Sequence, residues 1–287
     1  MSFELHRPRS LDEALMLLEK HEDAHVMAGA TALVLLMRQG LVRPSVVVSL
    51  RDAGLGGIRA ENDGSLWLGA TTTIREAEES PLVRAHCPAL AEAFGHVATV
   101  RIRDQATVGG NLAHADPAQD PPPMLLALGA EVELAKAGGT RRRVPVEELL
   151  VGLFETSIGP GEILTGVRVP PLAEGTRATY VKFLPRTEDD YATVSVAAVG
   201  RVRNGALADA RIALGSVGPT ALRARKTEAA LRDVATMPGG ADDGRLTAAA
   251  ALVRDEIDPL DDIRGTAEYK REMARVWTER AVRSLLS

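Results

Sequence analysis

The chain has 287 residues, of which 45% are apolar and 25% charged, and its net charge is −5. This balance is typical of an ordinary globular protein, and the length favours two or three domains. The negative charge disfavours a general nucleic-acid binder, which is usually basic, and the aromatic content of 3% disfavours a platform on which bases stack.

Cys87 is the only cysteine. A single thiol forms no internal disulfide, and it cannot hold an iron–sulfur cluster or a cysteine zinc site. The segment MSFELHRPRS at the N-terminus lacks the apolar centre of a signal peptide, and no apolar run is as long as a membrane span. We therefore expect a cytoplasmic protein without a membrane span.

The first predicted elements form a unit of about 57 residues. Ser10 and Glu13 fit a capping box at the start of a predicted helix over 11–20. A strand, a helix and a second strand follow at 25–28, 32–39 and 45–50. A strand–helix–strand unit of this length predicts two parallel strands.

The next part of the chain, 58–174, mixes both kinds of element. A predicted strand over 65–71 precedes a helical stretch over 73–94, which is interrupted near Pro81 and Pro88. Three further strand patterns, at 131–134, 141–146 and 162–170, indicate an antiparallel arrangement.

The sequence PPLAEGT at 170–176 marks a predicted domain boundary. Beyond it, three strand candidates lie at 179–184, 194–203 and 208–217, and Asn204-Gly205 is a typical hairpin turn between the last two. Helical patterns follow at 221–234, 246–256 and 266–286. The predicted class is α+β, with an N-terminal domain over 1–174, divided into subdomains at about 1–57 and 58–174, and a C-terminal domain over 175–287.

Two turns of small residues are candidates for a binding site. The first, 28–32, has the sequence AGATA and joins a predicted strand to a predicted helix that Thr31 caps. Small residues let the backbone approach a ligand, and the start of a helix offers unpaired N–H groups to phosphate. Turns of this kind are also common where no ligand binds, so this turn alone decides nothing.

The second turn, 107–111, has the sequence TVGGN, in which glycine permits positive φ or a close approach. Asp120 precedes three prolines, which is typical of a helix start. An N-cap carboxylate normally accepts from the next N–H groups, but Pro122 and Pro123 have none. We therefore expect any phosphate to be bound by the 107–111 loop rather than by the helix over 121–128. Asp120 would be free for another group, such as a ribose hydroxyl; alternatively, it is a solvated loop carboxylate.

The two turns together, AGAT at 28–31 and TVGGNLAHADPAQD at 107–120, resemble the FAD-binding medium subunit of the molybdenum hydroxylase family, which includes carbon monoxide dehydrogenase and xanthine dehydrogenase. GEILTGVRVP at 161–170 and YVKFLPRTEDDYATVSVA at 180–197 extend the resemblance over the chain. It implies an N-terminal FAD-binding domain of two α/β subdomains and a C-terminal domain with a three-stranded antiparallel sheet and helices.

The resemblance implies that FAD is the cofactor and that backbone N–H groups of both turns bind its diphosphate, namely those of Ala28, Gly29, Ala30, Thr31, Ala32, Thr107, Val108, Gly109, Gly110 and Asn111. It also implies that Asp120 lies on the ribose or ribityl side, Leu164 near the adenine or ring system, Lys182 at the flavin and Tyr191 near the isoalloxazine. Ala30 and Ala32 replace the family's usual glycine and polar residue. If Ala30 needs a positive φ, alanine is strained there by roughly 1 kcal/mol.

In this family the [2Fe–2S] clusters and the molybdopterin belong to other subunits or domains, which agrees with the single cysteine. The resemblance implies an electron-transfer subunit that takes electrons from a [2Fe–2S] small subunit and passes them from FAD to a terminal acceptor. A molybdopterin large subunit would complete a heterotrimer or its dimer. Because the cofactor carries such chemistry, we predict no catalytic side chain.

Other kinds of site are not expected. His114 and Asp116 have no further ligands nearby in sequence, so we predict no metal site. Two other functions remain open. One is a self-sufficient FAD oxidoreductase on the same scaffold, and the other is a nucleotide-binding or structural subunit without flavin chemistry.

Overall fold

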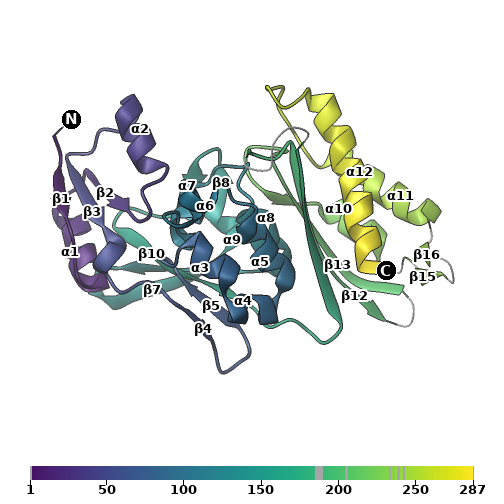
Figure 1. The fold of residues 1–287 in the computed structure, drawn as a ribbon, viewed down its shortest axis with the longest axis horizontal. Helices are drawn as coiled ribbons and strands as arrows, with labels where there is room; N and C mark the ends of the chain where they lie inside the picture. Colours follow the sequence, from purple (N-terminus) through teal and green to yellow (C-terminus); the bar gives the residue numbers. More distant parts are fainter. Residues whose placement is uncertain are drawn as a thin grey trace.

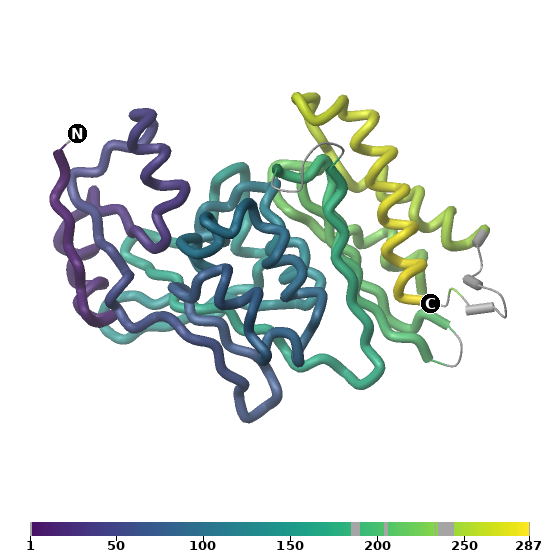
Figure 2. Tube along the Cα trace, viewed as in Figure 1, coloured from purple at the N-terminus to yellow at the C-terminus, as the bar shows by residue number. Residues whose placement is uncertain are grey.

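Three larger sheets follow one another along the chain in the computed structural model (Figure 1). The structure describes residues 2–184, 190–203, 206–232, 234, 236–237, 240–241 and 243–286. Figure 2 shows the N-terminus and the C-terminus toward opposite ends of the long axis. The chain thus runs through the three sheets in order, and the fold is a mixed α/β one.

The first sheet has three parallel strands in the order β1-β3-β2, with β1 at Glu4–His6, β2 at Ala24–Met27 and β3 at Val46–Ser49. Helices α1 (Leu11–Lys20) and α2 (Leu33–Gln39) connect them, and the short helix η1 (Leu50–Asp52) follows. The predicted parallel pair is confirmed. Only half of the capping box forms, because the Glu13 carboxylate accepts from the N–H of Arg9 instead of Ser10.

The second sheet has five antiparallel strands in the order β4-β5-β10-β6-β7: Ile58–Ala60, Leu66–Gly69, Glu162–Val169, Glu131–Lys136 and Thr140–Pro145. Its connections contain α3 (Ile74–Glu79), α4 (Pro81–His86), α5 (Pro88–Gly95), α6 (Val100–Arg103), α7 (Val108–His114), α8 (Pro121–Leu128), η2 (Ala137–Gly139) and α9 (Val146–Leu149). A small hairpin, β8 (Leu150–Gly152) and β9 (Glu155–Thr156), precedes β10. The predicted breaks at Pro81 and Pro88 are confirmed, because each proline begins a new helix, α4 or α5. Proline is tolerated at a first helical position because the N–H that it lacks has no acceptor inside the helix there.

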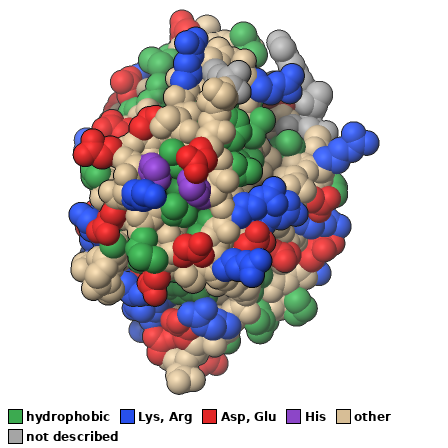
Figure 3. Space-filling view, turned by 90° about the vertical axis from the view of Figure 1, so that its left-hand side faces the viewer, with side chains coloured by type: hydrophobic (Ala, Val, Ile, Leu, Met, Phe, Trp, Pro, Cys, Tyr) green, Lys and Arg blue, Asp and Glu red, His purple; other side chains and the backbone are tan. Residues whose placement is uncertain are grey.

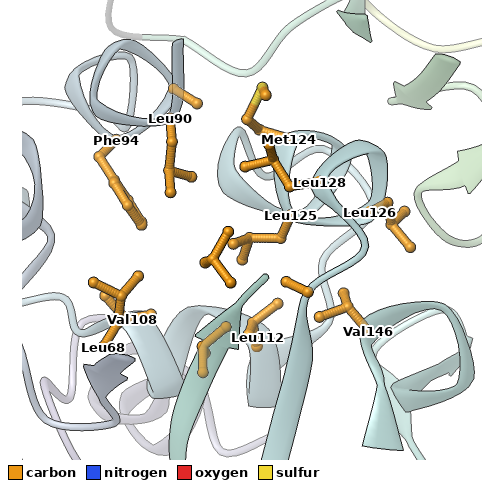
Figure 4. Close-up of a cluster of buried hydrophobic side chains, with 14 of the residues drawn as sticks. Leu68, Leu90, Phe94, Val108, Leu112, Met124, Leu125, Leu126, Leu128 and Val146 are labelled. Carbon is orange, nitrogen blue, oxygen red and sulfur yellow. The ribbon is translucent and has the colours of Figure 1, made fainter. Parts of the chain in front are cut away.

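The core of this middle part lies between the sheet and its helices (Figure 4). Leu68 of β5, Phe94 of α5 and Val108 of α7 turn their side chains into it, and all three are buried. The apolar residues at the start of α7 therefore place the second small-residue turn firmly against the sheet.

The third sheet is antiparallel in the order β11-β12-β13-β14: Thr176–Phe183, Val194–Arg203, Ala206–Gly215 and Leu222–Arg223. The expected sheet had three strands, and the fourth, β14, was missed. Two residues are too short for an alternating pattern, and they fell at the start of a predicted helix that begins only at Arg225. The predicted Asn204-Gly205 turn lies outside the described residues, although the strands on either side of it pair.

Helices α10 (Arg225–Leu231), α11 (Asp243–Ala251) and α12 (Ala267–Leu286) cover one face of the third sheet, with η3 (Leu252–Asp255) and the strand pair β15 (Thr236–Met237) and β16 (Gly240–Ala241) nearby (Figure 1). Helix α8 covers the other face and is buried along its whole length. Alternate residues of β12 enter two different cores, Val196 on the α12 side and Ala197 on the α8 side. This double burial explains the consecutive apolar residues Val196–Val199 of β12.

Candidate cofactor site

The first bend, Ala28–Ala32, connects β2 to α2. Within the described part of the chain, the backbone N–H groups of Gly29, Ala30, Thr31 and Ala32 donate to no protein acceptor. Ala32 and not the predicted Thr31 is the N-cap, and no side chain caps this end of α2. The bend thus offers consecutive unpaired donors where the helix dipole is positive.

Ala30 adopts a φ of 65°, in the left-handed region. Ala30 therefore has the positive φ at which the sequence analysis expects an alanine to be strained. A left-handed residue within a run of free amides turns successive N–H groups toward a common point, which is a typical anion-binding arrangement.

The second bend, Thr107–Asn111, is not the loop that the sequence predicted but the start of helix α7. Thr107 is its N-cap, and its Oγ1 accepts from the N–H of Gly110 at 3.1 Å. The N–H groups of Val108 and Gly109 donate to the carbonyls of Thr72 and Ala70, both at 2.9 Å, and that of Asn111 donates to Thr107. These four amides have protein partners, whereas the N–H of Thr107 donates to no acceptor among the described residues, so most of the free donors belong to the first bend.

The two bends touch each other. A Cβ atom added to Gly29 would lie 2.0 Å from the carbonyl oxygen of Gln105, and one added to Gly110 would lie 3.7 Å from the Cβ of Ala28. Gly29 is therefore required by a close backbone approach rather than by a positive φ. Segments far apart in the sequence converge at this point.

The groups around the contact fit a phosphate-containing ligand. The Oδ1 atom of Asn111 is buried and, among the described residues, has no hydrogen-bond partner. Buried polar atoms are normally paired, and since this oxygen only accepts, a hydroxyl group of a ligand would satisfy it. The described residues contain no cluster of histidine, cysteine, aspartate or glutamate that could hold a metal ion. The donor set suits a diphosphate.

Asp120 is the N-cap of α8 and, as predicted, makes no side-chain capping bond. Its carboxylate is only 4% exposed, which rules out a solvated loop carboxylate. One oxygen accepts from the hydroxyl of Tyr180 at 2.7 Å and the other from Nζ of Lys182 at 3.0 Å. The carboxylate is therefore not free, and a ligand hydroxyl would have to share or displace one of these donors.

Burial raises the pKa of Asp120, while the charge of Lys182 and the hydrogen bond from Tyr180 act in the opposite direction. Burial beside this carboxylate also raises the pKa of Tyr180 well above its ordinary value, so Tyr180 remains a donor. Lys182 donates its other bond to the carbonyl of His96 at 2.7 Å. This network joins the start of α8 and the end of α5 to strand β11.

Tyr191 is exposed, and the charge of Asp120 is among the causes that raise its pKa. The Cζ atom of the Arg264 guanidinium lies over its ring, 5.4 Å from the ring centroid. Partial burial, followed by the charge and hydrogen bonding of Asp116, raises the pKa of Tyr191 to about 12. Asp116 thus connects Tyr191 to the end of α7, the helix that the second bend starts.

Leu164 is buried in the core of the middle part, one residue before a β-bulge of β10. The carbonyl of its neighbour Thr165 accepts from the N–H of Ala70, whose own carbonyl holds Gly109. Leu164 is therefore close in the chain to the contacts that position the second bend.

A cleft of about 840 Å³ lies beside α5. Lys182 is among its lining residues, but no residue of either bend is; the charged ones are Glu78, Arg84, Glu92, Arg103 and Lys182. This cleft and the contact between the bends are separate features.

Sequence reasoning missed Tyr180, and it considered Asp116 only as a metal ligand beside His114. Tyr180 could have been found, because it is two residues from Lys182 on one strand and such residues share a face. Asp116 carried no spacing signal of its own.

Comparison with known families gives two matches. Residues 1–172 match the model of the FAD binding domain in molybdopterin dehydrogenase, and residues 179–285 match that of the CO dehydrogenase flavoprotein C-terminal domain.

Individual proteins match over nearly the whole chain. The carbon monoxide dehydrogenase medium chain of Afipia carboxidovorans is 38% identical, over 98% of this chain and 96% of its own. A carbon monoxide dehydrogenase structure from Hydrogenophaga pseudoflava has a TM-score of 0.92 and 36% identity, over 98% of this chain and 96% of that one. Quinoline 2-oxidoreductase from Pseudomonas putida 86 has a TM-score of 0.92 and 30% identity, over 100% and 97%.

Proposed function

The chain belongs to the family of FAD-binding subunits of molybdenum hydroxylases, and on that premise we propose that it is the electron-transfer subunit of such an enzyme. It takes electrons from a [2Fe–2S] subunit and passes them to a terminal acceptor, within an assembly that also contains a molybdopterin subunit. FAD, when bound, supplies this electron-transfer chemistry.

The observation that supports this proposal best is the contact between the two bends. Gly29 approaches the backbone at Gln105 too closely for any side chain, and four free amides follow at Gly29–Ala32. In the proposed site these amides bind the diphosphate, and the otherwise unpaired Oδ1 of Asn111 accepts a hydrogen bond from a hydroxyl group of the cofactor. The second bend, 107–111, positions the first, and its N–H of Thr107, which has no acceptor among the described residues, remains available to the diphosphate.

The remaining roles are proposals about orientation. Asp120 and Lys182 lie on the ribityl and flavin side, held by Tyr180, and Tyr191 lies near the isoalloxazine. Leu164 packs behind the adenine side. The proposed domain division, 1–174 and 175–287, falls between β10 and β11, which end and begin at Val169 and Thr176.

Relatives of this chain belong to enzymes that are named for different substrates. One is a subunit of carbon monoxide dehydrogenase and another structure is quinoline 2-oxidoreductase, yet both match nearly the full chain. Electron transfer through FAD needs no catalytic acid, base or nucleophile from this chain. We propose that substrate chemistry takes place on the molybdopterin subunit.

The proposal is tested by purifying a tagged copy of the chain from the cells that produce it. We expect the visible absorbance of bound flavin, FAD on extraction, and iron and molybdenum in the same fraction. Flavin without iron would support a self-sufficient oxidoreductase instead. A chain without flavin would support a structural subunit.

A further inference from the structure

A second cleft, of about 850 Å³, lies between the middle part of the chain and the third sheet. Its walls come from the C-terminal end of α8, the segment 170–173 that leads to β11, strands β12 and β13, and helix α10. None of the described residues that line it belongs to either small-residue bend. Cavities of this size, particularly at domain interfaces, often bind small molecules. The cleft is therefore a candidate site that is separate from the proposed FAD site.

One wall of the cleft is a part of the third sheet that α8 does not reach. The helix has eight residues, whereas β12 and β13 have ten each. Eight helical residues span about 12 Å and ten strand residues about 33 Å. Beside α8 this face of the sheet carries the buried Ala197 and Ala213. Farther along the same two strands it carries Arg201, Asp209 and Arg211, which line the cleft.

Helix α10 supplies a second charged wall. Arg225, Glu228 and Ala229 line the cleft, and Arg232, the C-cap of the helix, lines it as well. Their spacing of i, i+3, i+4 and i+7 places these residues on one side of the helix. Arginines from the sheet and from α10 thus face one space, namely Arg201, Arg211, Arg223, Arg225 and Arg232.

The charges of the cleft do not balance. Each acidic side chain that lines it pairs with an arginine: Asp209 with Arg201, Glu228 with Arg223, Glu147 with Arg225 and Glu131 with Arg168. The side chains of Arg211 and Arg232 are exposed, and they have no acid partner or hydrogen-bond acceptor in the part of the chain that the structure describes. Two guanidinium groups therefore remain available to a ligand.

Arg211 is positioned by the end of α8. A Cβ atom added to Gly129 would lie 2.6 Å from Nη1 of Arg211, so the guanidinium lies against the C-terminal end of the helix. The helix dipole is negative at that end and favours a cation there. This contact holds the side chain at the cleft and leaves its N–H groups free to donate.

We propose that this cleft binds a phosphate monoester, whose phosphate lies between Arg211 and Arg232. Guanidinium groups bind phosphate oxygens through paired N–H donors. A phosphate monoester carries nearly two negative charges at neutral pH, which matches the two cations without acid partners. A single carboxylate would neutralise only one of them. The site is independent of the proposed electron transfer.

The apolar part of the lining indicates what the phosphate is attached to. Pro170, Pro171 and Leu172 form an apolar wall opposite the charged ones. No aromatic side chain is among the described residues that line the cleft, so a base would have no ring on which to stack. A non-aromatic body therefore fits the cleft better than a nucleotide does.

The end of the molecule at the first sheet supplies a control. Figure 3 shows side chains of both charges scattered there among apolar ones. Arg51 of η1 belongs to this part of the chain, is exposed, and has no acid partner among the residues described. Its replacement tests whether any unpaired arginine on the surface attracts phosphate.

The experiment titrates inorganic phosphate, butyl phosphate and acetate into the complex purified with its FAD, and calorimetry measures binding. Arg211→Gln and Arg232→Gln each remove one cation, and Arg51→Gln is the matched control. Ala229→Glu adds a carboxylate to the α10 wall at an exposed position and leaves every arginine in place. Flavin absorbance is recorded throughout, because phosphate that releases FAD occupies the diphosphate site instead.

We expect one phosphate per chain to bind the unmodified protein. Arg211→Gln, Arg232→Gln and Ala229→Glu should each weaken binding about tenfold, as for the loss of a charged hydrogen bond. Arg51→Gln should change it by less than about twofold. Butyl phosphate should bind at least as tightly as inorganic phosphate, because its chain covers the apolar wall.

Four results would overturn the inference. They are no saturable binding of phosphate, binding that the three cleft variants leave unchanged, binding that occurs only as FAD is released, and acetate that binds as tightly as phosphate. Ala229→Glu keeps the test decisive if an arginine variant folds poorly, since it removes no contact of either arginine.

Discussion

Nζ of Lys182 lies 3.0 Å from a carboxylate oxygen of Asp120, and the two side chains are only 2% and 5% exposed. Asp120 begins helix α8, whereas Lys182 belongs to strand β11 of the third sheet. The prolines that follow Asp120 offer it no N–H to cap, which leaves its carboxylate for this contact between layers. The ion pair thus attaches the C-terminal sheet to the middle part of the chain.

Replacing Asp120 by asparagine should lower the free energy of unfolding by about 3–5 kcal/mol, because Lys182 would remain buried without its counter-charge. Urea unfolding measures the loss. Combining Asp120→Asn with Lys182→Met removes both charges and should recover much of it.

The matched control is the exposed pair of Glu147 and Arg225, whose side chains are 46% and 57% exposed. Glu147→Gln should change stability by less than about 0.5 kcal/mol. If Asp120→Asn were equally harmless, the buried pair would not hold the layers together.

Gly29→Ala should release bound FAD and destabilise the chain by about 1–3 kcal/mol, since the new methyl group would collide with the backbone at Gln105. The ratio of flavin to protein and urea unfolding are the measurements. Gly218→Ala is the control, because the nearest atoms there would be 3.6 and 3.8 Å away. If the Gly29 variant kept its full flavin content, the first bend would not be part of the FAD site.

Ala30→Gly should raise the free energy of unfolding by less than about 1 kcal/mol. It relieves the left-handed strain of alanine, but the greater freedom of glycine in the unfolded chain offsets part of that gain. Ala28→Gly, at a position whose φ is not positive, should instead lower stability by about 0.4–1 kcal/mol. Equal effects of the two substitutions would argue against strain at Ala30.

The buried side chain of His86 should make the free energy of unfolding depend on pH. Burial lowers its pKa, although Nε2 donates to the carbonyl of Pro170 at 2.9 Å, which acts in the opposite direction. The unfolded chain therefore binds a proton more readily, so this contribution to stability is present above the ordinary histidine pKa and is lost as pH falls below it.

Between about pH 7 and about pH 5, His86→Gln should lose less stability than the unmodified chain, as measured by urea unfolding. Above about pH 7.5 the two should follow parallel curves, since histidine is neutral in both states. An unchanged slope in the acid range would show that His86 does not contribute.

The sequence predicted those parts of the fold that depend on neighbours in the chain. Pro81 and Pro88 interrupt a helical pattern because proline has no N–H to donate inside a helix, and alternating or continuous apolar runs identify strands. The two-residue strand β14 was missed, because it exists only through pairing with β13.

The sequence by itself determined the small-residue bends, the uncapped Asp120 and the family to which the chain belongs, because each depends on residue types at short spacing. Only the tertiary structure decided that Asp120 pairs with Lys182 and Tyr180, that Gly29 touches Gln105, and that most of the free amides lie in the first bend. Hydrogen bonds between distant residues form where packing places donors beside acceptors, and that placement depends on the whole fold.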